Sequence, residues 1–288
     1  MNPIHPGKTH RPGMTLIEIL VVIAIIAILA SLILGGVMVF LRKGPEVKNR
    51  NDILQLSEGL HQFYAEHKFY PPDKIKLYSN LSSYNSTNPL DARSLSYIGA
   101  IWPNINRGIS HDWSGTGTPV NGVILEGDQC LVFFLGGIPQ GNQKAPRGFS
   151  NDPTSPTAAT VDRKKYFSFE SARCDTTLHA DATFPAYLDA HAPDLVVGSK
   201  KPFIYFGSSR GTGGYPNIGA IYPNSFSVSP YVENATSPVK YWNHTTFQII
   251  SAGPDGQFGK GGPWTPGTPP SSAGKDDVSN FHDRALGS

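Results

Sequence analysis

The sequence predicts an α+β protein in which one long N-terminal helix precedes a loop-rich antiparallel β-sheet head. Three observations lead to this prediction. Residues 19–41 form an uncharged apolar run, residues 53–67 carry apolar side chains at helical spacing, and the chain after residue 73 breaks into short apolar runs separated by Gly, Pro, Asn and Ser. Helical spacing indicates an amphipathic helix, and short runs between turn residues indicate strands.

The composition narrows the class of protein. The 288 residues include 24 Lys and Arg against 22 Asp and Glu, which gives a formal net charge of +2. Bulk charge therefore predicts no nucleic-acid partner. With 30 glycines and 25 prolines, the chain favours a loop-rich body over a helical bundle.

The apolar run is long enough to cross a membrane. As a helix its 23 residues would measure about 35 Å, against a hydrocarbon core of about 30 Å. An ordinary signal anchor is one explanation and a cleaved secretory signal another, although Gly35-Gly36-Val37 is a poor cleavage site. Neither explains Glu18, which lies inside the apolar stretch that begins at Met14, where a carboxylate is costly unless it is paired.

A specific motif surrounds that carboxylate. A short basic leader, Lys8 to Gly13, is followed by Met14-Thr15-Leu16-Ile17-Glu18. The segment from Gly13 to Glu18 closely resembles the recognition site of the prepilin peptidase in type IV pilin-like proteins, although that family usually has Phe where this chain has Met14. The resemblance implies cleavage after Gly13, N-methylation of Met14, and retention of the helix in the core of a filament. It also implies a single-pass protein of the bacterial inner membrane with its head in the periplasm.

Processing would give Glu18 a partner. Cleavage after Gly13 creates an α-amine on Met14, with an ordinary pKa near 8. That cation can pair with Glu18 of a neighbouring subunit in a dry filament core, so Glu18 is the predicted assembly residue.

The predicted domain organisation follows from these segments and from the pilin-like resemblance. Apolar residues from Ile53 to His67 recur at spacings of 3, 4, 3 and 4, with Gly44-Pro45 interrupting the helix before them and Pro71-Pro72 ending it. Predicted parts are a leader (1–13), a transmembrane and filament-core helix (14–43), an amphipathic helix continuing into the head (44–72), and the head (73–288). Predicted strands are 123–125, 131–135, 203–206 and 247–250, with loops at 141–160 and 261–274 and a large insertion of no recognised resemblance at about 78–240.

The C-terminal segment 251–281 carries two acidic groups, Asp255-Gly256 and Asp276-Asp277, separated by a Gly/Pro/Ser loop. Calcium prefers carboxylate and carbonyl oxygens in such flexible loops, although Asp-Gly is also an ordinary turn. The segment resembles the calcium loop of the major (G-type) pseudopilins of type II secretion systems. That resemblance implies calcium as cofactor, held by the side chains of Asp255 and Asp277 and the backbone carbonyls of Ala252 and Gln257, with Asp276 a further acidic candidate.

The remaining chemistry-bearing residues form no catalytic motif, so no enzyme is predicted. The pairs His179 with Asp181 and Asp189 with His191 are expected in solvated loops rather than as metal ligands. The four tryptophans are expected to anchor core or loops. Cys130 and Cys174 could form a periplasmic disulfide, or Cys130 could be a buried thiol; the sequence does not decide between them.

The two resemblances together imply a structural subunit of a periplasmic pseudopilus for type II protein secretion. Its implied partners are further copies of itself in a helical filament, the prepilin peptidase, other pseudopilins and inner-membrane assembly proteins. One alternative is a type IV pilus subunit for adhesion, motility or DNA uptake. Another is a membrane-tethered periplasmic binding module whose active part is the insertion.

Overall fold

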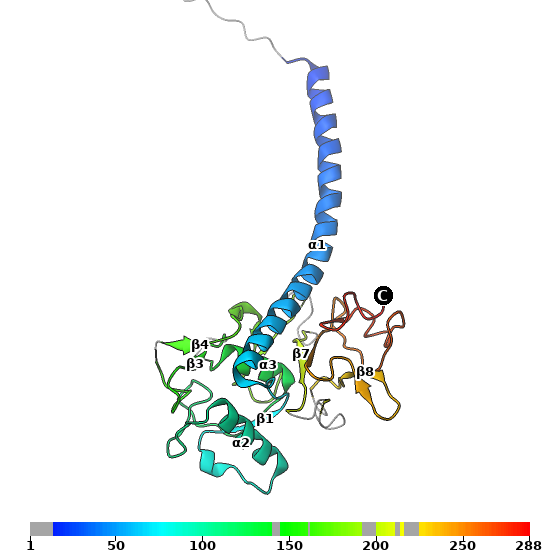
Figure 1. The fold of residues 1–288 in the computed structure, drawn as a ribbon. Helices are drawn as coiled ribbons and strands as arrows, with labels where there is room; N and C mark the ends of the chain where they lie inside the picture. Colours follow the sequence, from blue (N-terminus) through cyan, green and yellow to red (C-terminus); the bar gives the residue numbers. More distant parts are fainter. Residues whose placement is uncertain (1–13, 140–144, 161, 192–199, 211–213, 216–224) are drawn as a thin grey trace, which may run out of the picture. The chain divides into compact units, whose positions relative to one another are not determined.

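The computed structural model describes residues 14–139, 145–160, 162–191, 200–210, 214–215 and 225–288, with the backbone alone for residues 34–42. By its internal contacts the chain divides into two units, Met1–Pro45 and Glu46–Ser288. The second unit, here called the head, contains every strand and both hydrophobic cores of the described residues (Figure 1). The architecture is α+β, as predicted.

Helix α1 (Leu16–His67) is continuous through Pro45, so the interruption expected at Gly44-Pro45 is absent. A proline removes one backbone hydrogen bond, which an established helix can tolerate as a local bend. The helix ends earlier than Pro71-Pro72, because Lys68 adopts a left-handed backbone with φ of 64° while its N–H still bonds Tyr64.

In the first unit, the large apolar side chains of residues 16–33 are 47% to 81% exposed. Residues Leu16–Ile33 are long and apolar enough to cross a membrane, and they form one such segment among the residues described. Besides Glu18, the polar residue of this segment is Ser31, whose hydroxyl donates to the Ile28 carbonyl at 2.8 Å. The helix satisfies the backbone groups of Ser31, and the bond to Ile28 gives its hydroxyl hydrogen an acceptor. Ser31 can therefore lie in lipid without a water partner.

In the head, α1 presents the predicted apolar face. Ile53, Leu56, Leu60 and Phe63 are buried at 3% exposure or less, whereas Leu54 on the opposite side is 69% exposed. The amphipathic character predicted for this stretch is confirmed. Further helices are α2 (Pro89–Ile101) and α3 (Gly127–Gly136), with single 3-10 turns at Leu81–Ser83 and Ser171–Arg173.

Helix α3 corrects the sequence analysis, which predicted a strand at 131–135. All ten residues of α3 are buried, so it has no polar face to reveal a helical period. Its ends carry the local signals: Gln129 accepts from the Glu126 N–H in a capping box, and Gly137, with φ of 86°, stops the helix. Helix α3 lies beside β7 (Figure 1), and its residues from Cys130 to Leu135 belong to the larger core.

The strands are short and form several small sheets. A three-stranded antiparallel sheet has the order β12-β10-β7, and a mixed sheet β11-β8-β9 pairs β8 with β11 in parallel; β1 with β2, β3 with β4, and β5 with β6 form antiparallel pairs. The bounds are β1 Ile75–Tyr78, β2 Asn121–Leu125, β3 Phe149–Ser150, β4 Arg163–Lys164, β5 Cys174–Asp175, β6 Ala186–Tyr187, β7 Ile204–Gly207, β8 Tyr231–Asn234, β9 Lys240–Tyr241, β10 Phe247–Ser251, β11 Gly262–Pro263 and β12 Val278–Ser279.

Three predicted strands are therefore confirmed as parts of β2, β7 and β10, with bounds that differ by at most two residues. The predicted loops hold only the two-residue strands β3 and β11 among their described residues, and residues 141–144 lie outside that part of the chain. Residues within the predicted insertion, 78–240, make up much of the larger core. Strand β7 belongs to this range and pairs with β10, which follows it in the chain.

The buried face of α1 makes a testable contribution to stability. Leu60→Ala removes a fully buried side chain and should lower the free energy of unfolding by about 2–5 kcal/mol. Leu54→Ala on the same helix should stay within about 0.5 kcal/mol of the wild type. Urea unfolding of the detergent-solubilised chain, followed by tryptophan fluorescence, checks both; equal effects would contradict this assignment of the buried face.

Candidate functional site

The processing segment lies at the start of the described chain. Gly13 and the rest of the leader 1–13 lie outside the described residues, and Met14 is 67% exposed. Thr15 precedes α1, and its hydroxyl accepts from the Glu18 N–H at 3.3 Å. In return, Glu18 Oε2 accepts from the Thr15 N–H at 2.8 Å and from its hydroxyl at 3.0 Å.

This reciprocal pattern is a capping box. A Thr at the N-cap and a Glu three residues later satisfy two backbone N–H groups that a helix leaves open. The sequence Thr15-Leu16-Ile17-Glu18 carries that signature, and sequence reasoning about Glu18 missed it. Glu18 thus has a role within its own chain in addition to the intersubunit pairing predicted for it.

The C-terminal acidic segments lie next to each other. Asp276 Oδ2 accepts from the Asp255 N–H at 3.1 Å, which joins the two acidic groups across 21 residues of chain. Asp277 Oδ2 accepts from the Gly259 N–H at 2.9 Å and from the Tyr231 hydroxyl at 3.2 Å. The fold therefore brings Asp255, Asp276 and Asp277 to one loop cluster, as a shared ion would require.

Two oxygens of this cluster are buried without a hydrogen-bond partner among the described residues, Asp276 Oδ1 and Asp277 Oδ1. Asp277 has no exposed surface. Burial, reinforced by the charges of Asp276 and Asp255, raises the pKa of Asp277 to about 8 against the hydrogen bonds from Gly259 and Tyr231. Burial also raises the pKa of Asp276. A bound cation would offset the cost of burying both carboxylates, because its positive charge stabilises their ionised form.

The other two predicted calcium ligands are Ala252 and Gln257, which would bind through their backbone carbonyls. Ala252 is fully buried beside Gly253, whose φ of 66° brings it against the Asp276 carbonyl. A Cβ at Gly253 would lie 2.3 Å from that carbonyl oxygen, so the close approach requires glycine. Gln257 is exposed, and its N–H donates to Asp255 Oδ1 at 2.8 Å in an Asx turn.

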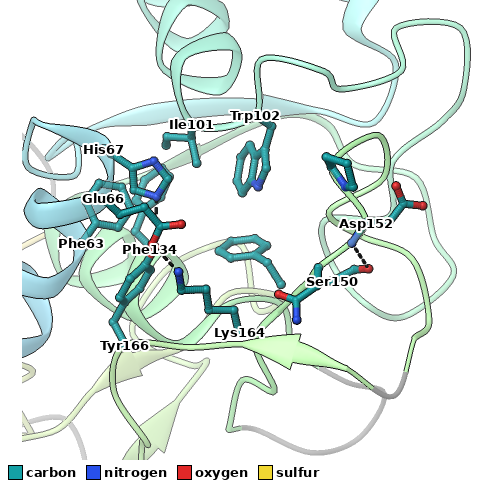
Figure 2. Close-up of a pocket in the computed structure, with 13 residues that line it drawn as sticks. Phe63, Glu66, His67, Ile101, Trp102, Phe134, Ser150, Asp152, Lys164 and Tyr166 are labelled. Atoms are coloured by element: carbon teal, nitrogen blue, oxygen red, sulfur yellow. Dashed lines mark hydrogen bonds and ion pairs between the residues drawn. The ribbon is translucent and has the colours of Figure 1, made fainter.

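A small pocket of about 160 Å³ is lined by residues of α1, α2 and α3 and of the strands β3 and β4 (Figure 2). Trp102 and Phe149 form part of its apolar wall, with ring centroids 4.9 Å apart. At the opposite end the Tyr166 hydroxyl donates to Glu66 at 2.6 Å, and Lys164 pairs with the same carboxylate.

The polar groups at the Glu66 end of this pocket bond to one another. Burial opposes ionisation of Glu66, but hydrogen bonds from Lys164 and Tyr166 outweigh it and lower the pKa of Glu66. Burial lowers the pKa of His67, whose Nε2 lies 3.0 Å from the Tyr166 hydroxyl. A carboxylate already paired with a lysine is a poor general base, so Glu66 is poorly suited to accept a proton from a bound molecule.

Four residues expected in solvated loops are largely withdrawn from solvent. The side chain of His179 is 9% exposed, Asp189 is fully buried and His191 is 6% exposed, while Asp181 is only partly exposed. The expectation of solvated loops was wrong for these residues, because the surrounding segments fold over α3 and α1. Ser251 shows this packing: its hydroxyl donates to Asp189 at 2.9 Å and accepts from Asn49 of α1 at 3.0 Å.

The cysteines and tryptophans belong to the interior. Cys130 and Cys174 are both buried thiols rather than the two halves of a disulfide. Burial raises the pKa of the Cys130 thiol well above its usual value, which makes it unreactive. Trp113 and Trp264 are buried, at 0% and 3% exposure, and each contacts a second tryptophan, Trp102 and Trp242 respectively. The anchoring role predicted for tryptophans is confirmed.

Comparison with protein families identifies the N-terminal segment. Residues 8–34 match the family model of the prokaryotic N-terminal methylation motif. No curated protein and no solved structure matches the chain. The matched residues contain Gly13, Met14 and Glu18 together with the apolar start of α1. The chain therefore carries the N-terminal signature of type IV pilin-like proteins that the prepilin peptidase processes.

Proposed function

We propose that this protein is a structural subunit of a periplasmic pseudopilus for type II protein secretion. The observation that carries the proposal is the methylation motif at residues 8–34, which overlaps a helical segment long and apolar enough to cross a membrane, Leu16–Ile33. Side chains of residues 16–33 that are 47% to 81% exposed in the single chain need either lipid or neighbouring helices around them. Lipid surrounds these side chains while the helix lies in the membrane, and neighbouring helices surround them once the filament has formed.

The assembly reaction uses the N-terminus of the processed chain. Cleavage after Gly13 frees the α-amine of Met14, and the helix then leaves the bilayer to pack against its neighbours. Met14 and Glu18 of adjacent subunits would pair inside this apolar core, where a charge pair is strong because water is excluded. In this proposal the protein has no enzymatic activity, and its work is mechanical.

Calcium is the proposed cofactor of the head. The support is the cluster of Asp255, Asp276 and Asp277 with its two unpartnered buried oxygens. Hard oxygen ligands in a loop containing Gly253 and Gly256, both at positive φ, suit the flexible coordination of calcium. Asp277 and Asp255 would supply side-chain ligands, and Ala252 and Gln257 backbone carbonyls.

The acidic loop favours a secretion pseudopilus over a surface pilus, because type IV pilins more often close this region with a disulfide and both cysteines here are buried thiols. The proposed partners are other copies of the chain, other pseudopilins, the prepilin peptidase and inner-membrane assembly proteins, with no nucleic acid. Deletion of the gene tests the choice. Loss of secreted proteins without loss of surface filaments supports the proposal, and loss of surface filaments would indicate the pilus.

Glu18 separates the assembly role from the capping role. Glu18→Gln keeps a side-chain acceptor for Thr15 but removes the charge, so helix α1 should still form while filament assembly falls sharply. Glu18→Ala should lose both roles, at an added cost of about 1 kcal/mol for the cap. Cross-linking of subunits in membranes measures assembly, and membrane fractionation serves as the control for insertion. Normal assembly of Glu18→Gln would contradict the charge pairing.

A further inference from the structure

A second cluster of side chains of the kinds that can bind metal ions lies at the N-terminus of α3, remote in sequence from the C-terminal acidic loop. Glu126 is the N-cap of α3, Asp128 lies in its first turn, and His179 reaches them from a loop 51 residues further on. One ligand atom of each lies within 4.8 Å of those of the other two. Tetrahedral zinc with bonds of about 2.0–2.2 Å places its ligand atoms about 3.3 Å apart, so modest side-chain rotation closes the gap.

The contacts within the cluster are short and specific. His179 Nε2 lies 2.7 Å from Asp128 Oδ2, and its Nδ1 lies 4.0 Å from Glu126 Oε2. Ser225 donates its hydroxyl to the same Glu126 oxygen at 2.6 Å. The imidazole is thus hydrogen-bonded to Asp128 at Nε2, while at Nδ1 the Ser225 hydroxyl, 3.4 Å away, links it to Glu126. Metal-ligating histidines are commonly oriented by an acceptor at the second ring nitrogen, a position that the Ser225 hydroxyl holds at Nδ1.

An unsatisfied group in this cluster argues for a ligand beyond the protein. Asp128 has no exposed surface, and its Oδ1 is buried with no hydrogen-bond partner among the described residues. Asp181, whose negative charge acts on His179, also has a buried oxygen without a partner, Oδ2. Buried carboxylate oxygens are normally satisfied by donors or by a cation.

The charge balance of the cluster points the same way. Three carboxylates, those of Glu126, Asp128 and Asp181, surround one imidazole. Within the part of the chain that is described, no lysine or arginine forms an ion pair with any of them. Even a protonated His179 leaves an excess of negative charge in a largely buried place. Two acidic side chains at a helix N-terminus suit the helix dipole, but that interaction does not explain the unpartnered oxygen of Asp128.

We propose that Glu126, Asp128 and His179 bind a divalent transition-metal ion of the Zn²⁺ type, with Asp181 as an outer-shell carboxylate. The imidazole selects this class of ion, because calcium and magnesium take oxygen ligands whereas zinc accepts imidazole together with carboxylate. The bound ion would tie the loop around His179 to the first turn of α3 and so stabilise the larger core. The inference is independent of the proposed function.

Metal titration of the full chain in detergent, after removal of bound metal with a chelator, tests the site. Zn²⁺ should raise the melting temperature of the wild type, by an amount that grows with the logarithm of its concentration. His179→Ala and Asp128→Asn should abolish the rise, and Asp181→Asn should weaken binding by about 10-fold or more. His244→Ala, which removes an exposed histidine outside the cluster, is the matched control and should respond as the wild type does.

Two further measurements keep the result decisive if a variant unfolds. Co²⁺ bound in place of Zn²⁺ should give visible absorption bands that Zn²⁺ displaces, and the milder His179→Gln variant should lose them. The Asp277→Asn variant of the C-terminal loop should retain the full Zn²⁺ response, which separates the two sites. No rise in melting temperature and no Co²⁺ bands in the wild type would overturn the proposal and leave His179 as the buried counter-ion of Asp128. A Zn²⁺ response that persists in His179→Ala would overturn it equally.

Discussion

Gly13→Val should leave the chain uncut, so that the protein purified from membranes begins at Met1 and carries no methyl group on Met14. The wild type should begin at Met14, with all 13 leader residues removed. The physical reason is steric, because the residue before the cleaved bond is glycine, which lets the peptidase approach the backbone closely. A β-branched side chain at this position would block that approach. The effect should be near-complete loss of processing.

Gly7→Val is the matched control, because it places the same side chain at another glycine of the leader, outside the residues 8–34 that match the methylation motif. It should be processed as the wild type is. N-terminal sequencing and the intact mass of both variants give the answer. A wild-type chain that begins at Met1, or after Gly36 as a secretory signal would leave it, would contradict the assignment of residues 1–13 as a prepilin leader. The uncut variant should still insert, since its apolar helix is unchanged.

Periodic segments were predicted well from the sequence, and locally capped segments were not. The buried face of α1 follows from spacing alone, because one side meets the core and the other meets water. Helix α3 has no such contrast, since both sides are buried and its apolar run is as compatible with a strand. The capping residue Glu126 and the stop at Gly137 were the signals available to find it.

Helix α2 shows the same limit inside the insertion. Asn88 caps it by accepting from the Leu90 and Asp91 N–H groups, and Pro89 occupies the first turn. Asn followed by Pro is a helix-start signature, which sequence analysis of 78–240 did not use. Local chemistry therefore carried information even where no resemblance to a known family existed.

The two candidate metal clusters differ in how far the sequence could reveal them. Asp276 and Asp277 adjoin β12, whose partner β10 leads into the loop that holds Asp255, so a plausible ligand set could be proposed from the two acidic segments. The cluster at Asp128 and His179 depends on a loop folding back over 51 residues, which no periodicity or spacing encodes. Only the three-dimensional packing brings these groups together.

Calcium should raise the melting temperature of the detergent-solubilised chain, and Asp277→Asn or Asp255→Asn should abolish the rise. Both substitutions keep the shape of the side chain, and an asparagine at 277 can still accept from the Gly259 N–H. What they remove is charge, on which a hard cation depends. Magnesium should substitute poorly, because it demands compact octahedral geometry. Asp283→Asn, at an exposed carboxylate near the same end of the chain, should leave the calcium response intact.

The pH dependence in chelator gives a second, independent test of the same residue. The pKa of Asp277 is raised to about 8 in the fold, against about 3.9 in the unfolded chain. Because the carboxyl group holds its proton more tightly in the fold, its contribution to stability is complete at pH values below the unfolded pKa. This stability is lost as the pH rises from about 4 to about 8, by up to about 1.4 kcal/mol per pH unit. Without calcium the melting temperature should therefore fall over that range in the wild type and fall less in Asp277→Asn.

Calcium should reverse this trend, since it binds the ionised carboxylate and its stabilising effect must grow as the competing proton is lost. The comparison is a set of melting curves for the wild type and Asp277→Asn between pH 5 and pH 8, in chelator and in calcium. A calcium effect that is the same at both ends of the range would remove Asp277 from the ligand set. An unchanged melting temperature in calcium at every pH would make Asp255-Gly256 an ordinary turn, and the secretion proposal would then depend on the N-terminal motif alone.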